Sequence, residues 1–281
     1  NAEQQELAQV ASQGGHTLMA LINNILDFSK IESDHLVLQQ DWFSLQQTAE
    51  AVVTLLAPQA MQKNITLCLV LDPDLRESYY GDPLRISQVL INLISNAIKF
   101  TEHGGVQITI AIKRQNGIDI QVKDTGIGIS AADQQHIFSE FVQAESSSNR
   151  RFGGSGLGLA ISQRIIALMQ GSIEVSSTLN LGSEFTVWLP LPCKQDTNCL
   201  VPMMQRSNPH QLHFYHAIDN PVLVASLTQQ LAWFALPFLD IRLTTTRLTP
   251  PAIVFIANDL SGQQRSQLQP TPQSDIEFVN L

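Results

Sequence analysis

Four short motifs follow one another in the middle of the chain and constrain its fold more than any other feature. They are the segments 92–101 (NLISNAIKFT), 124–129 (DTGIGI), 137–141 (IFSEF) and 153–159 (GGSGLGL). Each motif alone is a weak signal, because glycine clusters are common in turns and pairs of asparagines on a helix are frequent. Their order and spacing are hard to obtain by chance, and together they predict a nucleotide pocket.

Composition narrows the class of protein. A length of 281 residues allows one large domain or two of ordinary size, and we expect two domains behind a helical lead-in. The chain has 25 acidic and 16 basic residues, a net charge of −9, which disfavours nucleic acid as a partner. Three cysteines without metal-type spacing fit a reducing cytoplasmic setting better than a disulfide framework.

The sequence of the first residues predicts part of a longer helix. The chain starts at Asn1 within a helical pattern, so we expect a fragment of a longer protein. Between residues 7 and 28, apolar or small residues recur at steps of three and four, which is typical of a bundle helix. Such a helix needs a partner: a second copy in a homodimer, an absent helix, or its own domain. No apolar run approaches the roughly 20 residues of a membrane helix, and we expect no direct membrane contact.

Residues 39–192 are predicted to form one domain. Helical periodicity occurs in 42–58, 83–100 and 159–170, and strand-like patterns occur in 65–71, 106–112, 118–123, 173–177 and 184–189. Asn116 and Gly117 favour a hairpin turn, and Gly171 favours a helix end. The predicted fold class is α+β: a two-layer α/β sandwich with a mixed sheet, preceded by the long bundle helix of residues 1–38.

A linker and a second, truncated domain are predicted to follow. The linker is the polar, proline-containing segment 193–210, and the second domain is 211–281. Its predicted elements are strands at 212–217, 238–243, 252–257 and 276–281 and a helix at 221–234. Alternation of strands and helices predicts a parallel sheet and therefore a flavodoxin-like α/β domain.

The first motif places three polar side chains on one face of a helix. Asn92 and Asn96 are four residues apart, and Lys99 lies three residues further on the same side. An amide oxygen is a suitable neutral ligand for Mg²⁺, and an ammonium group can meet a phosphate oxygen. The alternative is a solvated helix face without a ligand.

The second motif begins with Asp124 at the end of a predicted strand. Gly126 and Gly128 follow at once and allow a close backbone approach to a flat ligand. A carboxylate there suits the exocyclic amine of adenine. The alternative is an aspartate that serves only the turn, which is common in Asp-X-Gly sequences.

The last motif opens directly into a helix, so its backbone N–H groups are placed to meet phosphates. The residues concerned are Gly154, Ser155, Gly156, Leu157 and Gly158. A dinucleotide-binding fold would need a strand before the glycines, but 143–151 is polar and serine-rich, and a Walker loop is excluded because no Gly-Lys-Ser or Gly-Lys-Thr occurs. The segment 143–151 is typical of a mobile lid whose Arg150 and Arg151 swing toward a γ-phosphate; solvated arginines without a role are the alternative.

Taken with these motifs, residues 41–191 resemble the catalytic and ATP-binding domain of sensor histidine kinases. The motifs match the family's N box, first glycine box, F box and second glycine box, and the segment 82–88 resembles hybrid kinases of the BarA and GacS type. The resemblance implies that ATP and Mg²⁺ bind here. By this similarity Asn96 would bind Mg²⁺ with Asn92 beside it, Lys99 would meet phosphate, Phe100 would pack near adenine, and Asp124 would take its amino group.

The resemblance also bears on the reaction. Gyrase-type and chaperone relatives of this fold carry a glutamate, a base for water, where this chain has Asn92. An amide cannot take a proton from water, so hydrolysis should be slow and the γ-phosphoryl group kept for another nucleophile. The rivals to a kinase are an ATPase of the same fold and a nucleotide-gated regulatory or dimerisation module without kinase activity.

The lead-in segment 6–32 resembles the second helix of the family's dimerisation and phosphoacceptor hairpin. The acceptor histidine lies in the first helix of that hairpin, in a His-Glu-X-Arg-Thr-Pro sequence that does not occur here. We reject His16 as a substitute, and we interpret His35, His103 and His136 as surface residues. The chain is therefore expected to lack a catalytic phosphoacceptor and to be unable to autophosphorylate alone. The expected partners are a second copy of the chain and a response regulator or downstream phosphorelay domain, with a parent protein anchored in the bacterial inner membrane.

The second domain resembles a response-regulator receiver more loosely. Asp219 matches the acidic turn of receivers, but Ile218 replaces the partner acid, and Ala257 stands where the phosphorylated aspartate is expected. A receiver needs clustered carboxylates to hold Mg²⁺. We interpret the domain as a degenerate receiver; a working receiver that uses Asp259 is the alternative.

Overall fold

The computed structural model describes residues 36–113, 117–140, 156–194 and 220–232, four further strands within residues 213–280, and the isolated positions 15, 22, 26, 29 and 33. Positions 15, 22, 26 and 29 are helical, in agreement with the predicted lead-in helix. In the part of the chain that the structure describes, no helix is both long and apolar enough to cross a membrane.

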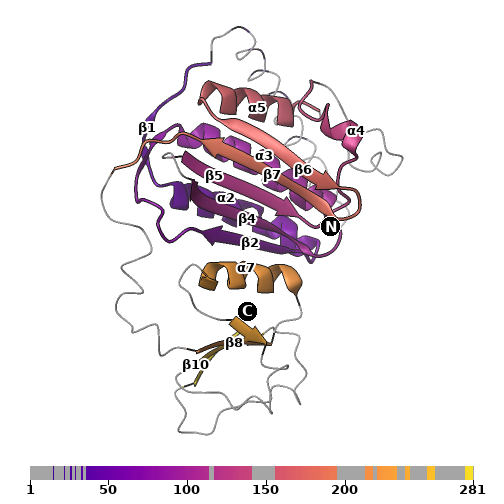
Figure 1. Ribbon diagram of the computed structural model, residues 1–281. Helices are drawn as coiled ribbons and strands as arrows, with labels where there is room; N and C mark the ends of the chain where they lie inside the picture. Colours follow the sequence, from indigo (N-terminus) through magenta and orange to yellow (C-terminus); the bar gives the residue numbers. More distant parts are fainter. Residues whose placement is uncertain are drawn as a thin grey trace, which may run out of the picture.

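A mixed five-stranded sheet forms the centre of the first unit (Figure 1). Its strands, in spatial order, are β2 (Thr66–Leu71), β4 (Gly105–Lys113), β5 (Gly117–Asp124), β7 (Gly182–Leu189) and β6 (Ser172–Thr178). β2 runs parallel to β4, and all other neighbours are antiparallel. The pairs β4–β5 and β6–β7 are the two predicted hairpins. Three helices of this unit that pack with the sheet are α2 (Leu45–Gln62), α3 (Pro83–Phe100) and α5 (Gly158–Leu168). The predicted two-layer sandwich is confirmed.

Helix α3 has the boundaries that its sequence predicts. Asp82 caps its start, because an Asp82 carboxylate oxygen accepts a hydrogen bond from the Arg85 N–H at 3.1 Å. Pro83 occupies the first helical turn, where its missing N–H has no partner to lose. The other Asp82 oxygen accepts from Gln39 N at 2.8 Å and so ties the entering chain to the helix.

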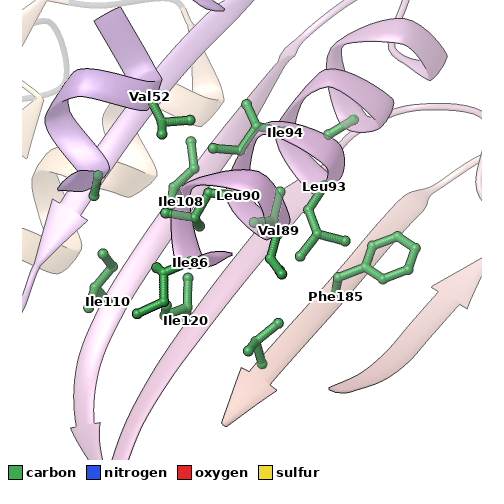
Figure 2. Close-up of a cluster of buried hydrophobic side chains, with 14 of the residues drawn as sticks. Val52, Ile86, Val89, Leu90, Leu93, Ile94, Ile108, Ile110, Ile120 and Phe185 are labelled. Atoms are coloured by element: carbon green, nitrogen blue, oxygen red, sulfur yellow. The ribbon is translucent and has the colours of Figure 1, made fainter. Parts of the chain in front are cut away.

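The core lies between α3 and the sheet. Seven side chains of α3 recur at helical spacing and are buried: Ile86, Val89, Leu90, Leu93, Ile94, Ala97 and Ile98. They meet inward-facing residues of β4 and β5, among them Ile108, Ile110 and Ile120 (Figure 2). Burial of this stripe leaves the polar side chains of α3 on its remaining faces, and that orientation positions the site described below.

Three local features differ from the sequence-based expectations. Helix α2 begins at Leu45, after the Ser44 cap, and continues through Pro58 to Gln62, beyond the predicted range of 42–58, because Leu56 and Ala60 on either side of the proline are buried in the core. Trp42 belongs to a short strand, β1 (Asp41–Phe43), which pairs with β3 (Tyr79–Gly81) in a ladder that was not predicted. Helix α5 ends through Gln170, whose positive φ of 61° leaves the helical path before Gly171.

The C-terminal unit contains a parallel four-stranded sheet, as predicted. Its elements are β8 (His213–Ala217), α7 (Pro221–Ala232), β9 (Phe238–Asp240), β10 (Ala252–Ile256) and β11 (Ile276–Asn280). The spatial order is β9-β8-β10-β11, and every pairing is parallel. In chain order this is 2-1-3-4, the arrangement of flavodoxin-like sheets.

Helix α7 packs against β2, the edge strand of the first sheet, and against its neighbour β4 (Figure 1). The contact is polar. Gln107 on β4 donates to Gln229 Oε1 at 2.7 Å and accepts from Ser226 Oγ at 2.9 Å, and the side chain of Asn220 donates to Thr66 Oγ1. The two units are therefore joined through a hydrogen-bonded layer that sequence patterns did not indicate.

Candidate functional site

The polar face of α3 lies against the start of α5. Asn96 Nδ2 donates to Asn92 Oδ1 at 3.4 Å, and Asn92 Nδ2 donates to Ser162 Oγ at 2.9 Å. A Cβ atom at Gly158 would lie 2.3 Å from Asn92 Oδ1, so a larger residue there would displace the Asn92 amide. The first and last motifs are thus brought together, and Ser162, which sequence reasoning missed, orients the Asn92 amide.

The side chains of Asn92 and Asn96 differ in their hydrogen bonds. Both polar atoms of the Asn92 side chain are engaged within the protein, whereas Asn96 Oδ1 accepts no hydrogen bond from any of the described residues. An amide oxygen in that position is a hard, neutral donor of the kind that Mg²⁺ takes. Within the described residues, no group of three or more His, Cys, Asp or Glu side chains could hold a metal ion.

Asp124 is buried at the end of β5, with 6% of its surface exposed. Its Oδ1 atom accepts hydrogen bonds from Gly126 N at 2.8 Å and from Ser183 N at 3.2 Å. Burial raises the pKa of the Asp124 carboxyl above its ordinary value, and the two backbone N–H groups partly oppose this by lowering it. Among the described residues both hydrogen bonds end on Oδ1, so the carboxylate is held through one oxygen.

The turn after Asp124 is packed against α3 and β6. A Cβ atom at Gly126 would lie 2.4 Å from the Phe100 carbonyl oxygen, and one at Gly128, where φ is +68°, would lie 2.1 Å from the Thr178 carbonyl oxygen. Ile127 N also donates to Phe100 O at 3.3 Å. Contacts within the protein therefore require these glycines, and the turn carrying Asp124 sits directly on the last residue of α3.

Lys63 and Lys99 lie near each other at the C-terminal end of α3. Lys99 Nζ lies 4.9 Å from the centre of the Phe100 ring. Burial lowers the pKa of Lys99, and the nearby ammonium group of Lys63 lowers it further. Lys63 was missed by sequence reasoning. No local signal could have found it, because it follows α2 and reaches residues 35 to 38 positions away along the chain.

The second glycine motif is described only from residue 156. Gly156 has a φ of +69°, and Leu157 precedes the first turn of α5 without a side-chain cap, with its own side chain buried. Arg150, Arg151, Gly154 and Ser155 lie outside the described residues, and their roles stay predictions. In the third motif Ile137 and Phe138 pack against the core, and the Phe138 ring meets Phe185 edge to face at 6.4 Å.

Of the other residues for which the sequence predicted a role or a surface position, the structure describes only some. His103 and His136 are exposed, as predicted. Six further residues with predicted roles lie outside those that the structure describes, and their roles stay predictions: His16, His35, Ile218, Asp219, Ala257 and Asp259.

Comparison with known proteins decides the family. Residues 81–193 match the family described as Histidine kinase-, DNA gyrase B-, and HSP90-like ATPase. These residues form a histidine-kinase ATP-binding domain. This histidine-kinase domain contains the whole of α3, the Asp124 turn and α5, so the family match and the geometry of the site coincide.

The curated relatives of this domain include histidine kinases. The chain is 39% identical over 202 residues to the signal transduction histidine-protein kinase BarA of Escherichia coli strain K12, which covers 70% of this chain and 22% of BarA. It is 44% identical over 184 residues to the sensor histidine kinase GacS of Pseudomonas protegens, which covers 64% of this chain and 20% of GacS. The chain therefore spans about a fifth of the length of these curated relatives.

Solved structures extend the likeness to both units. Full-length ShkA in complex with AMPPNP has a TM-score of 0.80 at 26% identity, over 99% of this chain and 57% of ShkA. The histidine kinase ThkA in complex with the response regulator protein TrrA has a TM-score of 0.51 at 27% identity, over 64% of this chain and 49% of that one. The histidine-kinase domain thus belongs to two-component signalling.

Proposed function

We propose that this chain is the ATP-binding catalytic core of a hybrid sensor histidine kinase that transfers the γ-phosphoryl group of ATP to a histidine of a dimerisation hairpin. The observation that carries the proposal is the convergence of three motifs, far apart in sequence, on one region of the histidine-kinase domain. Asn92 on α3 contacts Ser162 on α5, and the turn after Asp124 packs on Phe100 at the end of α3.

In this proposal each side chain has a defined role at the nucleotide. Asn96 holds Mg²⁺ through Oδ1, and Asn92, oriented by Ser162, positions the Asn96 amide. When bound, Mg²⁺ neutralises charge that develops on the phosphates. Asp124 accepts a hydrogen bond from the adenine amine. The remaining contacts are proposed by resemblance: Lys99 with phosphate, Phe100 with adenine, Gly126 and Gly128 in the adenine turn, the segment 154–158 with phosphates, and Arg150 and Arg151 with the γ-phosphate.

The side chain of Asn92 favours transfer of the γ-phosphoryl group over hydrolysis of ATP. Its side chain is a neutral amide engaged in two hydrogen bonds within the protein, and it has no lone pair basic enough to take a proton from water. The domain then acts by positioning the nucleotide and stabilising charge while an imidazole nitrogen from outside the domain attacks phosphorus.

The partners proposed are a second copy of the chain, through the helical hairpin, and a response regulator or a downstream phosphorelay domain. The ThkA structure with the response regulator TrrA supports the second kind of partner. We keep the acceptor histidine outside this chain, since no acceptor sequence occurs in it. A parent protein anchored in the bacterial inner membrane is part of the same proposal.

We propose in addition that the C-terminal unit is a degenerate receiver. The flavodoxin-like strand order supports this assignment, since receivers share that order. The substitutions by Ile218 and Ala257 favour a domain that accepts no phosphoryl group, and phosphorylation at Asp259 is the outcome that would contradict it.

The test is a phosphotransfer assay. This chain is mixed with γ-labelled Mg·ATP and a separately made hairpin that carries the histidine helix. We expect acid-labile label on the hairpin, lost with Asn96→Ala and kept with Gln47→Ala, which removes an exposed amide on α2. Label released as phosphate instead would indicate an ATPase. Bound ATP without either product would indicate the nucleotide-gated regulatory module.

A further inference from the structure

Lys63, the residue that follows α2, caps the end of a different helix. Its Nζ atom donates hydrogen bonds to three carbonyl oxygens at the C-terminus of α3: Ile98 O at 2.8 Å, Lys99 O at 2.7 Å and Thr101 O at 3.3 Å. An ammonium group has three N–H donors, and here all three find an acceptor. The ammonium group of Lys63, the residue after α2, therefore caps the C-terminus of α3.

Lys63 caps α3 at its C-terminus, where carbonyl groups lack partners within the helix. The last four carbonyls of an α-helix have no partner within the helix, and the C-terminus carries the negative end of the helix dipole. At this end of α3 the Thr101 hydroxyl donates to Ala97 O at 2.8 Å, and Lys63 serves the carbonyls of Ile98, Lys99 and Thr101. A positive charge at this point both satisfies the carbonyls and opposes the dipole.

The capped turn is also part of the proposed nucleotide site. It carries Lys99 and Phe100, and the Phe100 carbonyl accepts from Ile127 N in the turn that follows Asp124. The absent Cβ of Gly126 lets that turn lie against the same carbonyl. A displacement of the last turn of α3 would therefore move the proposed phosphate contact, the proposed adenine contact and the Asp124 turn together.

We propose that Lys63 is a positioning residue for nucleotide binding, which acts through the end of α3 and does not touch the nucleotide. This inference rests on the proposed ATP site. The carbonyls of Ile98, Lys99 and Thr101 are the groups through which it acts. Lys63 is also close enough to Lys99 for its charge to affect that side chain, so a substitution at position 63 changes both the geometry and the field at Lys99.

The experiment compares Lys63→Met and Lys63→Arg with Lys113→Met in the whole chain. Lys113 is paired with Asp119 at 3.0 Å, at the opposite end of the β4–β5 ladder from Asp124, and serves as the control. Mg·ATP affinity is measured by titration calorimetry well below each melting temperature. We expect Lys63→Met to weaken ATP binding about tenfold, as removal of charge-assisted hydrogen bonds at the pocket wall predicts. We expect Lys63→Arg to recover part of the loss and Lys113→Met to bind like the unmodified chain.

A double-mutant cycle separates positioning from a general loss of stability. Lys63→Met is combined with Lys99→Met, and we expect its effect on ATP affinity to be smaller in that background, because the position of Lys99 no longer matters. A lower melting temperature with unchanged ATP affinity, or additive effects in the cycle, would overturn the proposal. Lys63→Gln, judged by the same criteria, replaces Lys63→Met should that variant not fold. If the unmodified chain does not bind ATP, the proposed function itself fails.

Discussion

Replacement of Asp124 by asparagine changes one oxygen atom of the site to an amino group and leaves the fold nearly untouched. The Oδ1 acceptor of Asp124→Asn can keep both backbone hydrogen bonds, from Gly126 N and Ser183 N. The second oxygen becomes an NH₂ group, which would face the adenine amine as donor against donor. Loss of a charge-assisted hydrogen bond in a buried position amounts to about 3 kcal/mol, so we expect ATP affinity to fall about 100-fold.

The same substitution has a pH-dependent effect on stability. Burial raises the pKa of folded Asp124 above its ordinary value of 3.8, so the folded state binds its proton more tightly than the unfolded state. Well below pH 3.8 the carboxyl is neutral in both states, and Asp124→Asn should be as stable as the unmodified chain. As pH rises through the raised pKa, the buried charge destabilises the unmodified chain, and the variant should become the more stable of the two.

Two assays check this prediction: titration calorimetry with Mg·ATP, and urea unfolding as a function of pH. Asp41→Asn is the matched control, because Asp41 also accepts a backbone hydrogen bond, from Trp42 N at 2.7 Å, but at an exposed position. An ATP affinity of Asp124→Asn within twofold of the unmodified chain would refute the assignment of the adenine contact. A variant less stable at neutral pH would refute the reasoning on the buried charge.

Two further predictions concern the fold. Leu90→Ala removes a side chain that is 1% exposed in the core, and it should lower the free energy of unfolding by about 3 kcal/mol in urea denaturation; a loss below about 1 kcal/mol would contradict the packing described for α3. Ser226→Cys, made in a chain with Cys193→Ser and Cys199→Ser, should form a disulfide with Cys68 on oxidation, because the Cys68 thiol contacts the Ser226 hydroxyl across the α7 interface. Mass spectrometry that finds both thiols free would show that α7 does not rest on β2 and β4 in solution.

Local sequence determined those helices and strands whose boundaries and apolar patterns are set by residues within or next to the element. The start of α3 follows from Asp82 and Pro83, and its length follows from an apolar stripe at helical spacing. The β4–β5 ladder follows from two apolar segments separated by a short turn. The polar face with Asn92 and Asn96 follows from a spacing of four residues, and the parallel C-terminal sheet follows from the alternation of strands and helices.

Tertiary packing decided the rest. The β1–β3 ladder joins strands of three residues that are distant along the chain, and no three-residue pattern specifies such a partner. Pro58 should have ended α2, but burial of its neighbours kept the helix intact. The partners of Asn92 and of Gln107, on α5 and α7, likewise depend on how helices and sheets stack.

The site shows the same division between local and non-local information. The shared role of Asp124, Lys99 and Asn96 at a nucleotide stays a prediction, but that the motifs of Asp124 and Lys99 pack together could be expected, because they occur in a characteristic order. That Asp124 is held through one oxygen, and that Lys63 caps α3, could not. Hydrogen bonds between residues tens of positions apart depend on the distance between packed elements, and this distance is set by the volume of the side chains buried between them.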